Sequence, residues 1–130
     1  MTTATPNMKD KTIMLVEDNP HNRKIFSAML EHSGFSVVEA EEGNQAIETA
    51  RRTKPALILM DLSIPGLDGW EVTRRLKADA ETRHILIVAL TAHAMRGDEE
   101  RALQAGCDGY LSKPISPKKV VEEVKRYLKL

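Results

Sequence analysis

The sequence contains a single cysteine, Cys107, so no disulfide bond can form within the chain. This scarcity fits a reducing compartment, and we expect a cytoplasmic location. The longest apolar run, ILIVAL at 85–90, is far too short to cross a bilayer. The polar start, MTTATPNMKDK, has no apolar signal region. These absences predict a soluble protein that does not insert into a membrane.

Charge of one sign is not in excess either. The chain carries 19 Lys and Arg and 19 Asp and Glu residues, so its formal net charge is zero. A nonspecific nucleic-acid binder normally has a basic excess, so we expect no direct contact with nucleic acid. The sequence also lacks a GxxxxGK[ST] loop, which excludes nucleotide binding of the P-loop kind.

Two patterns alternate along the 130 residues, a length that suits one domain. Short apolar runs typical of buried strands occupy residues 12–16, 36–40, 56–60, 85–90 and 109–112. Between them, apolar residues recur at helical spacing. Examples of this spacing are Ile25, Phe26, Met29 and Leu30, and later Val120, Val121 and Val124. The alternation predicts parallel βαβ units with helices on both faces of the sheet.

Local signals mark where some helices begin. Asn19 before Pro20, and Ser116 before Pro117, each place a capping side chain ahead of a proline that suits the first helical turn. The segment 94–105 is polar nearly all round and contains glycine, so we expect the least firmly packed helix there. Residues 1–10 are expected to form a flexible tail.

Polar residues follow four of the predicted strands. Glu17 and Asp18 come after the first strand, Asp61 after the third, Thr91 after the fourth and Lys113 after the fifth. In an open parallel sheet, ligands bind outside the carboxyl ends of the strands. We therefore expect these five residues to meet at one edge of the sheet.

The expected site needs a cation. Three carboxylates and one lysine leave two negative charges, which a divalent ion would neutralise. Oxygen ligands without paired cysteine or histidine favour Mg²⁺, with Mn²⁺ as the alternative. A metal, a lysine and a hydroxyl beside a carboxylate suit phosphoryl transfer. This chemistry predicts that Asp61 acts as a nucleophile and forms an aspartyl phosphate.

Four motifs carry a family resemblance in the right order: LVEDNPHNR (15–23), LILMDLSIPGLDGWEV (57–72), IVALTAHA (87–94) and GYLSKPI (109–115). Over residues 11–130 the chain resembles the receiver domain of two-component response regulators. It is similar to stand-alone chemotaxis-type regulators, to DivK-type regulators and to receivers of hybrid histidine kinases. The resemblance implies a flavodoxin-like (βα)5 fold with strand order 2-1-3-4-5. Because the chain ends after the fifth helix, we expect no output domain.

The same resemblance assigns the site. It implies that Asp61 accepts a phosphoryl group from a histidine kinase or phosphotransfer protein. Glu17 and Asp18 match the acidic pair that binds Mg²⁺, together with Asp61 and the backbone carbonyl of Ser63. Ser63 and His93 occupy the two positions that tune hydrolysis in the family.

The resemblance also implies a switch. Thr91 matches the hydroxyl that moves to the phosphoryl group, and Tyr110 the aromatic that follows it inward. Lys113 matches the family's lysine at the site, and Lys113–Pro114 is expected to be a cis peptide. The face formed by the fourth helix, fifth strand and fifth helix would then change for partner binding or phosphorelay to a downstream protein.

Other interpretations of these residues stay open. Tyr110 also suits a plain core position. A phosphatase with Asp61 as nucleophile would usually need a second acid two residues on, where this chain has Ser63. A flavin binder would need a phosphate-cradling loop after the first strand, where EDNPHN would repel phosphate. We therefore expect a phosphoacceptor that is not a turnover enzyme.

Overall fold

The structure is a computed structural model that describes residues 11–62, 64, 66, 68–91 and 98–130. The predicted tail over residues 1–10 lies outside these ranges. Strands and helices alternate in the order β1 (Thr12–Val16), α1 (Pro20–His32), β2 (Ser36–Ala40), α2 (Gly43–Thr53), β3 (Leu57–Asp61), α3 (Gly69–Ala78), β4 (Leu86–Thr91), α4 (Asp98–Ala105), β5 (Gly109–Ser112) and α5 (Pro117–Leu128).

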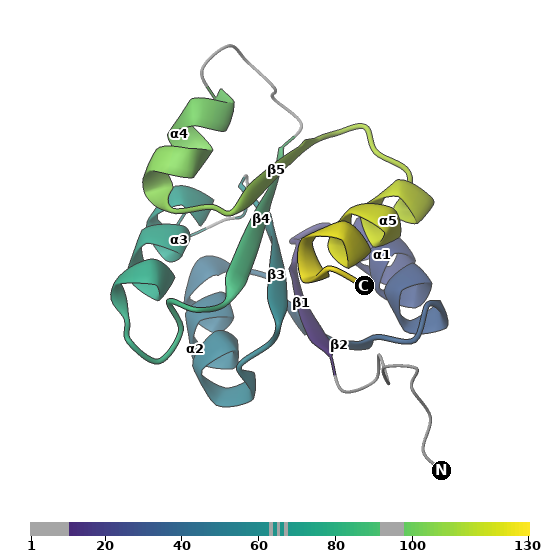
Figure 1. Ribbon diagram of the computed structural model, residues 1–130, viewed down its shortest axis with the longest axis horizontal. Helices are drawn as coiled ribbons and strands as arrows, with labels where there is room; N and C mark the ends of the chain where they lie inside the picture. The colour runs from purple at the N-terminus through teal and green to yellow at the C-terminus, as the bar shows by residue number, and fades with distance from the viewer. Residues whose placement is uncertain (1–10, 63, 65, 67, 92–97) are drawn as a thin grey trace.

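The five strands form one parallel sheet in the order β2-β1-β3-β4-β5. Helices α1 and α5 cover one face, and α2, α3 and α4 cover the other (Figure 1). The predicted flavodoxin-like, doubly wound fold is therefore confirmed, including its strand order.

The strands contribute side chains to two cores, one on each face of the sheet, because successive side chains of a strand point to opposite faces. In β3, Ile58 and Met60 pack with the residues of α2 and α3, whereas Leu57 and Leu59 pack with those of α1 and α5. All four side chains are fully buried. Burial on both faces explains why these strands are continuously apolar in the sequence.

Both predicted helix starts are confirmed. The Asn19 side chain accepts hydrogen bonds from the backbone N–H groups of His21 and Asn22, at 2.9 and 3.0 Å. Ser116 Oγ accepts one from the N–H of Lys119, at 3.1 Å. These contacts satisfy donors that have no partner inside the helix.

The expected apolar stripe of α1 is only partly correct. Phe26 and Leu30 are buried, but Ile25 is 39% exposed and Met29 is half-buried. Adjacent helical residues project about 100° apart, so the face that buries Phe26 turns Ile25 toward solvent.

Two strands are shifted by one residue relative to the prediction, at both their start and their end. The runs 56–60 and 85–90 become β3 (Leu57–Asp61) and β4 (Leu86–Thr91). Asp61 pairs with Leu90 in the sheet register, and the N–H of Leu62 donates to the Leu90 carbonyl at 3.0 Å. The end of a strand is determined by where its backbone hydrogen bonding stops, and not by where its apolar residues stop. Asp61 and Thr91 are thus the last residues of their strands, and the ladder fixes their backbones.

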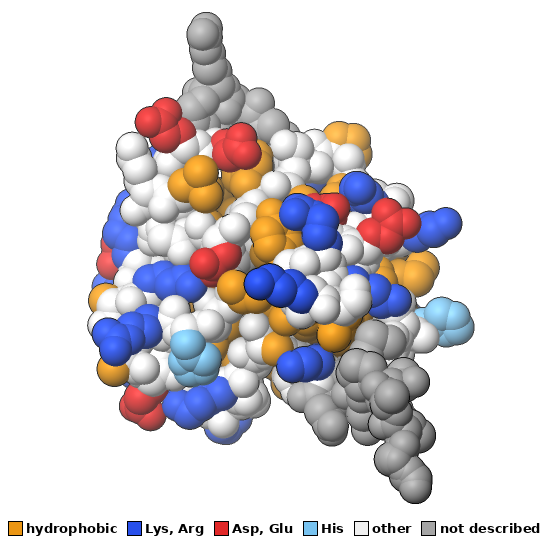
Figure 2. All heavy atoms as spheres, viewed as in Figure 1, with side chains coloured by type: hydrophobic (Ala, Val, Ile, Leu, Met, Phe, Trp, Pro, Cys, Tyr) orange, Lys and Arg blue, Asp and Glu red, His pale blue; other side chains and the backbone are white. Residues whose placement is uncertain are grey.

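Helix α4 covers residues 98–105 of the predicted segment 94–105; residues 94–97 lie outside the described ranges. Ala102 and Ala105 of α4 are buried, whereas Leu103 is 53% exposed. No helix within the described ranges combines the length and apolar character needed to span a membrane. Figure 2 shows basic and acidic side chains interspersed over the visible face, in keeping with the zero net charge.

The start of α3 is packed tightly against the end of β3. A Cβ atom on Gly69 would lie 2.9 Å from Leu62 Cα and 3.2 Å from the Asp61 carbonyl oxygen. Gly69→Ala should therefore lower the free energy of unfolding by about 1–3 kcal/mol, because backbone rather than a flexible side chain must move. Urea denaturation measures this difference.

The matched control for this substitution is Glu48→Ala on α2, where the side chain is 79% exposed. Its effect should stay within about 0.5 kcal/mol. An unfolding midpoint for Gly69→Ala equal to that of the wild type would contradict the close contact.

Candidate functional site

Four strands end at the same edge of the sheet and bring their polar residues together there. Glu17 follows β1, Asp61 and Thr91 are the last residues of β3 and β4, and Lys113 follows β5. Glu17, Asp61 and Thr91 are 1%, 2% and 7% exposed, whereas Asp18 is exposed. The site thus combines buried carboxylates with one acidic side chain that faces water.

The charged groups of this cluster lie within contact distance. Glu17, Asp18 and Asp61 each offer a carboxylate oxygen, and these oxygens lie within 4.8 Å of one another. Lys113 Nζ lies 3.0 Å from Glu17 Oε1 and 3.2 Å from Asp61 Oδ2. The structure therefore brings together the four charged residues that the sequence singled out.

Three hydrogen bonds hold Glu17, the first acidic residue after β1, in place. The N–H of Glu17 donates to the Ala40 carbonyl at 3.0 Å, which continues the β1–β2 pairing. The N–H of Asn19 donates to Glu17 Oε2 at 3.2 Å. From α1, Arg23 Nη1 donates to the Glu17 carbonyl at 2.9 Å.

Arg23 is a residue of the site region that the sequence patterns did not single out. Besides the Glu17 carbonyl, its guanidinium contacts Glu39 at 3.6 Å and Glu41 at 3.3 Å. The available signal was its position six residues after Glu17, in the first turns of α1 and inside the motif LVEDNPHNR. An arginine on a helix, taken alone, is typical of a solvated surface, so its position in the sequence did not predict a contact with the site.

The electrostatics of the cluster follow from burial and proximity. Burial raises the pKa of Glu17, and the nearby Asp61 raises it further, against the opposing hydrogen bonds from Lys113 and the Asn19 N–H. Burial acts to lower the pKa of Lys113, but Asp61 and Glu17 together outweigh it, so the pKa of this lysine is raised. Lys113 thus keeps its positive charge at neutral pH.

The donor set fits a hard divalent cation. Three carboxylates against one ammonium leave two negative charges in a partly buried space, and a divalent ion neutralises them. All three side-chain donors are oxygens, and exposed Asp18 leaves one side open to the water molecules that Mg²⁺ retains.

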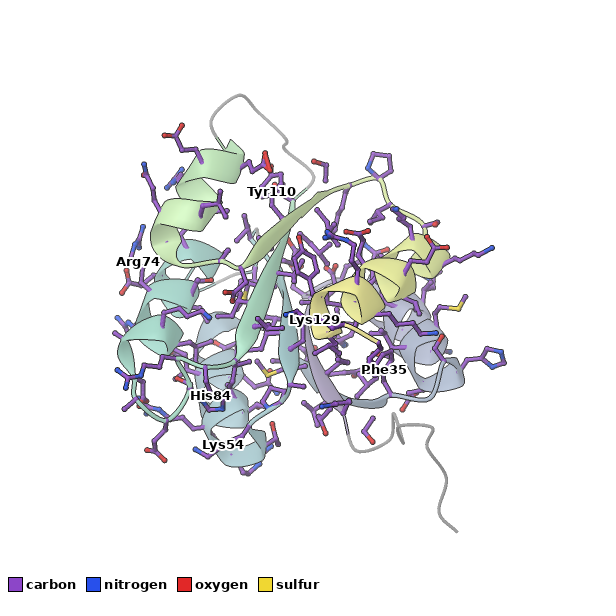
Figure 3. All side chains as sticks on the ribbon, in the orientation of Figure 1. Phe35, Lys54, Arg74, His84, Tyr110 and Lys129 are labelled. Atoms are coloured by element: carbon purple, nitrogen blue, oxygen red, sulfur yellow. The ribbon has the colours of Figure 1, made fainter. Side chains whose placement is uncertain are left out.

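Of the remaining predicted residues, the structure describes Tyr110 and the Lys113–Pro114 peptide but not Ser63 or His93. Tyr110, in β5, is half-buried and packs against the core under α2 and α3; Figure 3 shows it near the top of the view, beside α4. The Lys113–Pro114 peptide is cis, as the resemblance implies. Ser63 and His93, assigned to hydrolysis tuning, lie outside the described residues.

With this geometry in view, comparison with known proteins is decisive. The model of the response regulator receiver domain matches residues 13–125. The chain belongs to this family. The receiver domain is 48% identical to the polar-differentiation response regulator DivK of Brucella anthropi over 118 residues, which cover 91% of this chain and 96% of that protein.

Solved structures agree. The receiver domain of sensor histidine kinase PA1611 from Pseudomonas aeruginosa, solved with magnesium coordinated in its active site cleft, has 40% identity and a TM-score of 0.84. The match covers 92% of this receiver domain and 98% of that chain. A receiver domain of a histidine kinase from Syntrophus aciditrophicus has 30% identity and a TM-score of 0.83, with coverage of 92% and 90%.

Family membership carries general properties. Receiver domains take part in two-component phosphorelays, work with histidine kinases and downstream targets, and typically carry an aspartyl phosphate and bind Mg²⁺. They are generally not turnover enzymes. The predicted family is thus confirmed.

The crowded carboxylates predict a stability cost in the absence of metal. Asp61→Asn should raise the free energy of unfolding in EDTA at pH 7.5 by about 0.5–2 kcal/mol, because it removes a buried charge next to Glu17. Urea denaturation with and without Mg²⁺ measures this. Mg²⁺ should stabilise the wild type more than Asp61→Asn, since the variant has lost a ligand charge.

The sign of the pH dependence follows from Glu17. The pKa of Glu17 is raised in the folded state, so ionising this carboxyl group lowers the free energy of unfolding. The loss is absent below the ordinary pKa of 4.5 and grows as pH rises from there to the folded pKa. The advantage of Asp61→Asn in EDTA should therefore shrink at pH 5. A variant that is less stable than the wild type at pH 7.5 would contradict the predicted repulsion between Glu17 and Asp61.

Proposed function

We propose that this chain is a phosphorylation-controlled signalling domain in which Asp61 accepts a phosphoryl group from a histidine kinase or phosphotransfer protein. One observation carries the proposal: a buried carboxylate at the end of β3 lies with two other carboxylates and 3.2 Å from Lys113. The 48% identity to DivK of Brucella anthropi supports it. Residues 11–130 would form the receiver domain.

The metal-binding residues would be Glu17, Asp18 and Asp61, together with the backbone carbonyl of Ser63. When bound there, Mg²⁺, or Mn²⁺ in its place, supplies positive charge beside the oxygens of the transferring phosphoryl group. The Pseudomonas aeruginosa receiver domain, with magnesium in its active site cleft, supports the same use of this cluster.

The chain's own residues would act on the phosphoryl group directly. An Asp61 carboxylate oxygen attacks the phosphorus of a phosphohistidine, so an O–P bond forms while the N–P bond breaks and the imidazole leaves. Lys113 contacts Asp61 and Glu17, which supports the proposal that its ammonium would donate to the new phosphoryl oxygens. Ser63 and His93 would set how fast water removes the group.

The switch would begin at Thr91. This buried residue ends β4, next to β3, and its carbonyl accepts a hydrogen bond from the N–H of Lys113 at 2.7 Å. Its hydroxyl would turn to the phosphoryl oxygens, and Tyr110 would move into the space that Thr91 vacates. The resulting change in the α4-β5-α5 face would be read by a downstream protein or passed on by phosphorelay.

Two settings suit such a domain. The similarity to DivK favours a single-domain regulator. Two structural neighbours, from Pseudomonas aeruginosa and Syntrophus aciditrophicus, are receiver domains of histidine kinases, which favours a receiver within a hybrid kinase as the second candidate. In neither setting would the domain act as a turnover enzyme.

Acetyl phosphate tests the phosphoacceptor. With Mg²⁺, intact mass should show one added phosphoryl group, stable in acid and labile in base, and none for Asp61→Asn or in EDTA. Asp68→Asn is the matched control. The Asp68 side chain caps α3 by accepting a hydrogen bond from the N–H of Glu71, and asparagine caps a helix equally well. Phosphorylation of Asp61→Asn at the wild-type rate would contradict the assignment, and steady phosphate release would favour the phosphatase.

Thr91→Ala tests the switch. The variant should still gain the phosphoryl group, but the spectral shifts of β5 and α5 amides on phosphorylation should weaken, with the coupling reduced on the order of tenfold. Two-dimensional NMR with acetyl phosphate measures this. Thr53→Ala, which removes a hydroxyl that donates to the Thr49 carbonyl on α2, is the control. Wild-type shifts in Thr91→Ala would count against the proposed role of this hydroxyl.

A further inference from the structure

A stacked pair joins α4 to α3. The guanidinium carbon of Arg101, in α4, lies 4.6 Å from the centroid of the Trp70 ring, at the start of α3. The buried side chains of α4, Ala102 and Ala105, are small, and Leu103 is exposed. Because alanines bury little apolar area, the stack adds a large aromatic contact to the small ones that these side chains make.

Trp70 is itself fixed relative to Asp61. The preceding residue, Gly69, lies so close to Leu62 Cα and the Asp61 carbonyl that no Cβ fits between them. Trp70 is half-buried and packs against the same core cluster as Tyr110. The backbone of Trp70 therefore follows directly from a residue packed against the end of β3, while its ring packs on this core cluster and touches Arg101 of α4. Figure 1 shows α4 directly beside α3.

The chemistry of the pair suits a reversible contact. A guanidinium is attracted to the face of an indole by the ring quadrupole, and its plane adds stacking contact that an ammonium lacks. Arg101 is exposed, and at exposed sites such a contact corresponds to about a two- to fivefold change in an equilibrium constant. That strength is enough to bias the position of a weakly packed helix without locking it.

We propose that Arg101 is a positioning residue: its stack on Trp70 couples α4 to the start of α3, and through Gly69 to Asp61. This coupling runs beside the one through Thr91 and Tyr110, and it rests on the proposed function. A change at Asp61 would move α4 against an anchored indole, so it would alter the surroundings of Trp70.

Hydrogen exchange tests the positioning step without phosphorylation. Arg101→Ala and Arg101→Lys should both speed amide exchange in residues 98–105 by about two- to fivefold, while exchange in 117–128 stays unchanged. Gln104→Ala, which shortens another exposed side chain of α4, is the matched control and should leave these rates unchanged. Wild-type exchange in Arg101→Ala would overturn the positioning role.

Fluorescence tests the coupling, because Trp70 is the only tryptophan in the chain. Acetyl phosphate with Mg²⁺ should change Trp70 emission in the wild type, and Arg101→Ala should at least halve the change at an equal phosphorylated fraction, measured by intact mass. An equal change in both proteins, or no change in a phosphorylated wild type, would overturn the coupling. Absence of any mass gain would overturn the proposed function instead, and the exchange rates would still decide the positioning role.

Discussion

The contact of one lysine with two buried carboxylates is the constraint on which the site depends. Lys113 meets Glu17 and Asp61 although these residues come from three separate loops or strand ends of the chain. Carboxylates so close together repel each other, and one ammonium does not balance the two buried carboxylates and the exposed Asp18. On the proposed function, this imbalance suits charges that arrive from outside: first a cation, then a phosphoryl group.

The sheet makes this crowding possible. Parallel strands end at a common edge, and the hydrogen-bonded ladder runs through Asp61 and Thr91 rather than stopping before them. Their backbones are held by the same interactions that hold the core. Flexible segments could not hold groups that repel each other at fixed positions. The charged residues of the site accordingly lie at the end of a strand, or directly after one, where the two cores meet the solvent.

Much of this arrangement could be predicted from the sequence. The unbroken apolar runs required burial on both faces, which dictated a parallel sheet, and the sheet dictated that Glu17, Asp61 and Lys113 converge. Two things could not be predicted. The ends of β3 and β4 were placed one residue early, because the apolar run stops before the backbone pairing does. The roles of Arg23 and Arg101 were missed, because both contacts depend on how neighbouring elements pack rather than on local spacing.

The position of Arg23 has a consequence for how cation affinity is set. Its guanidinium joins the carbonyl of Glu17 to Glu39 and Glu41, which lie in and just after the edge strand β2. The loop that carries two of the proposed metal ligands is thus tied to the rim of the sheet. Two relatives with identical ligands can therefore differ in ion affinity solely through sequence drift along that outer strand, where comparisons restricted to the cleft would see no difference.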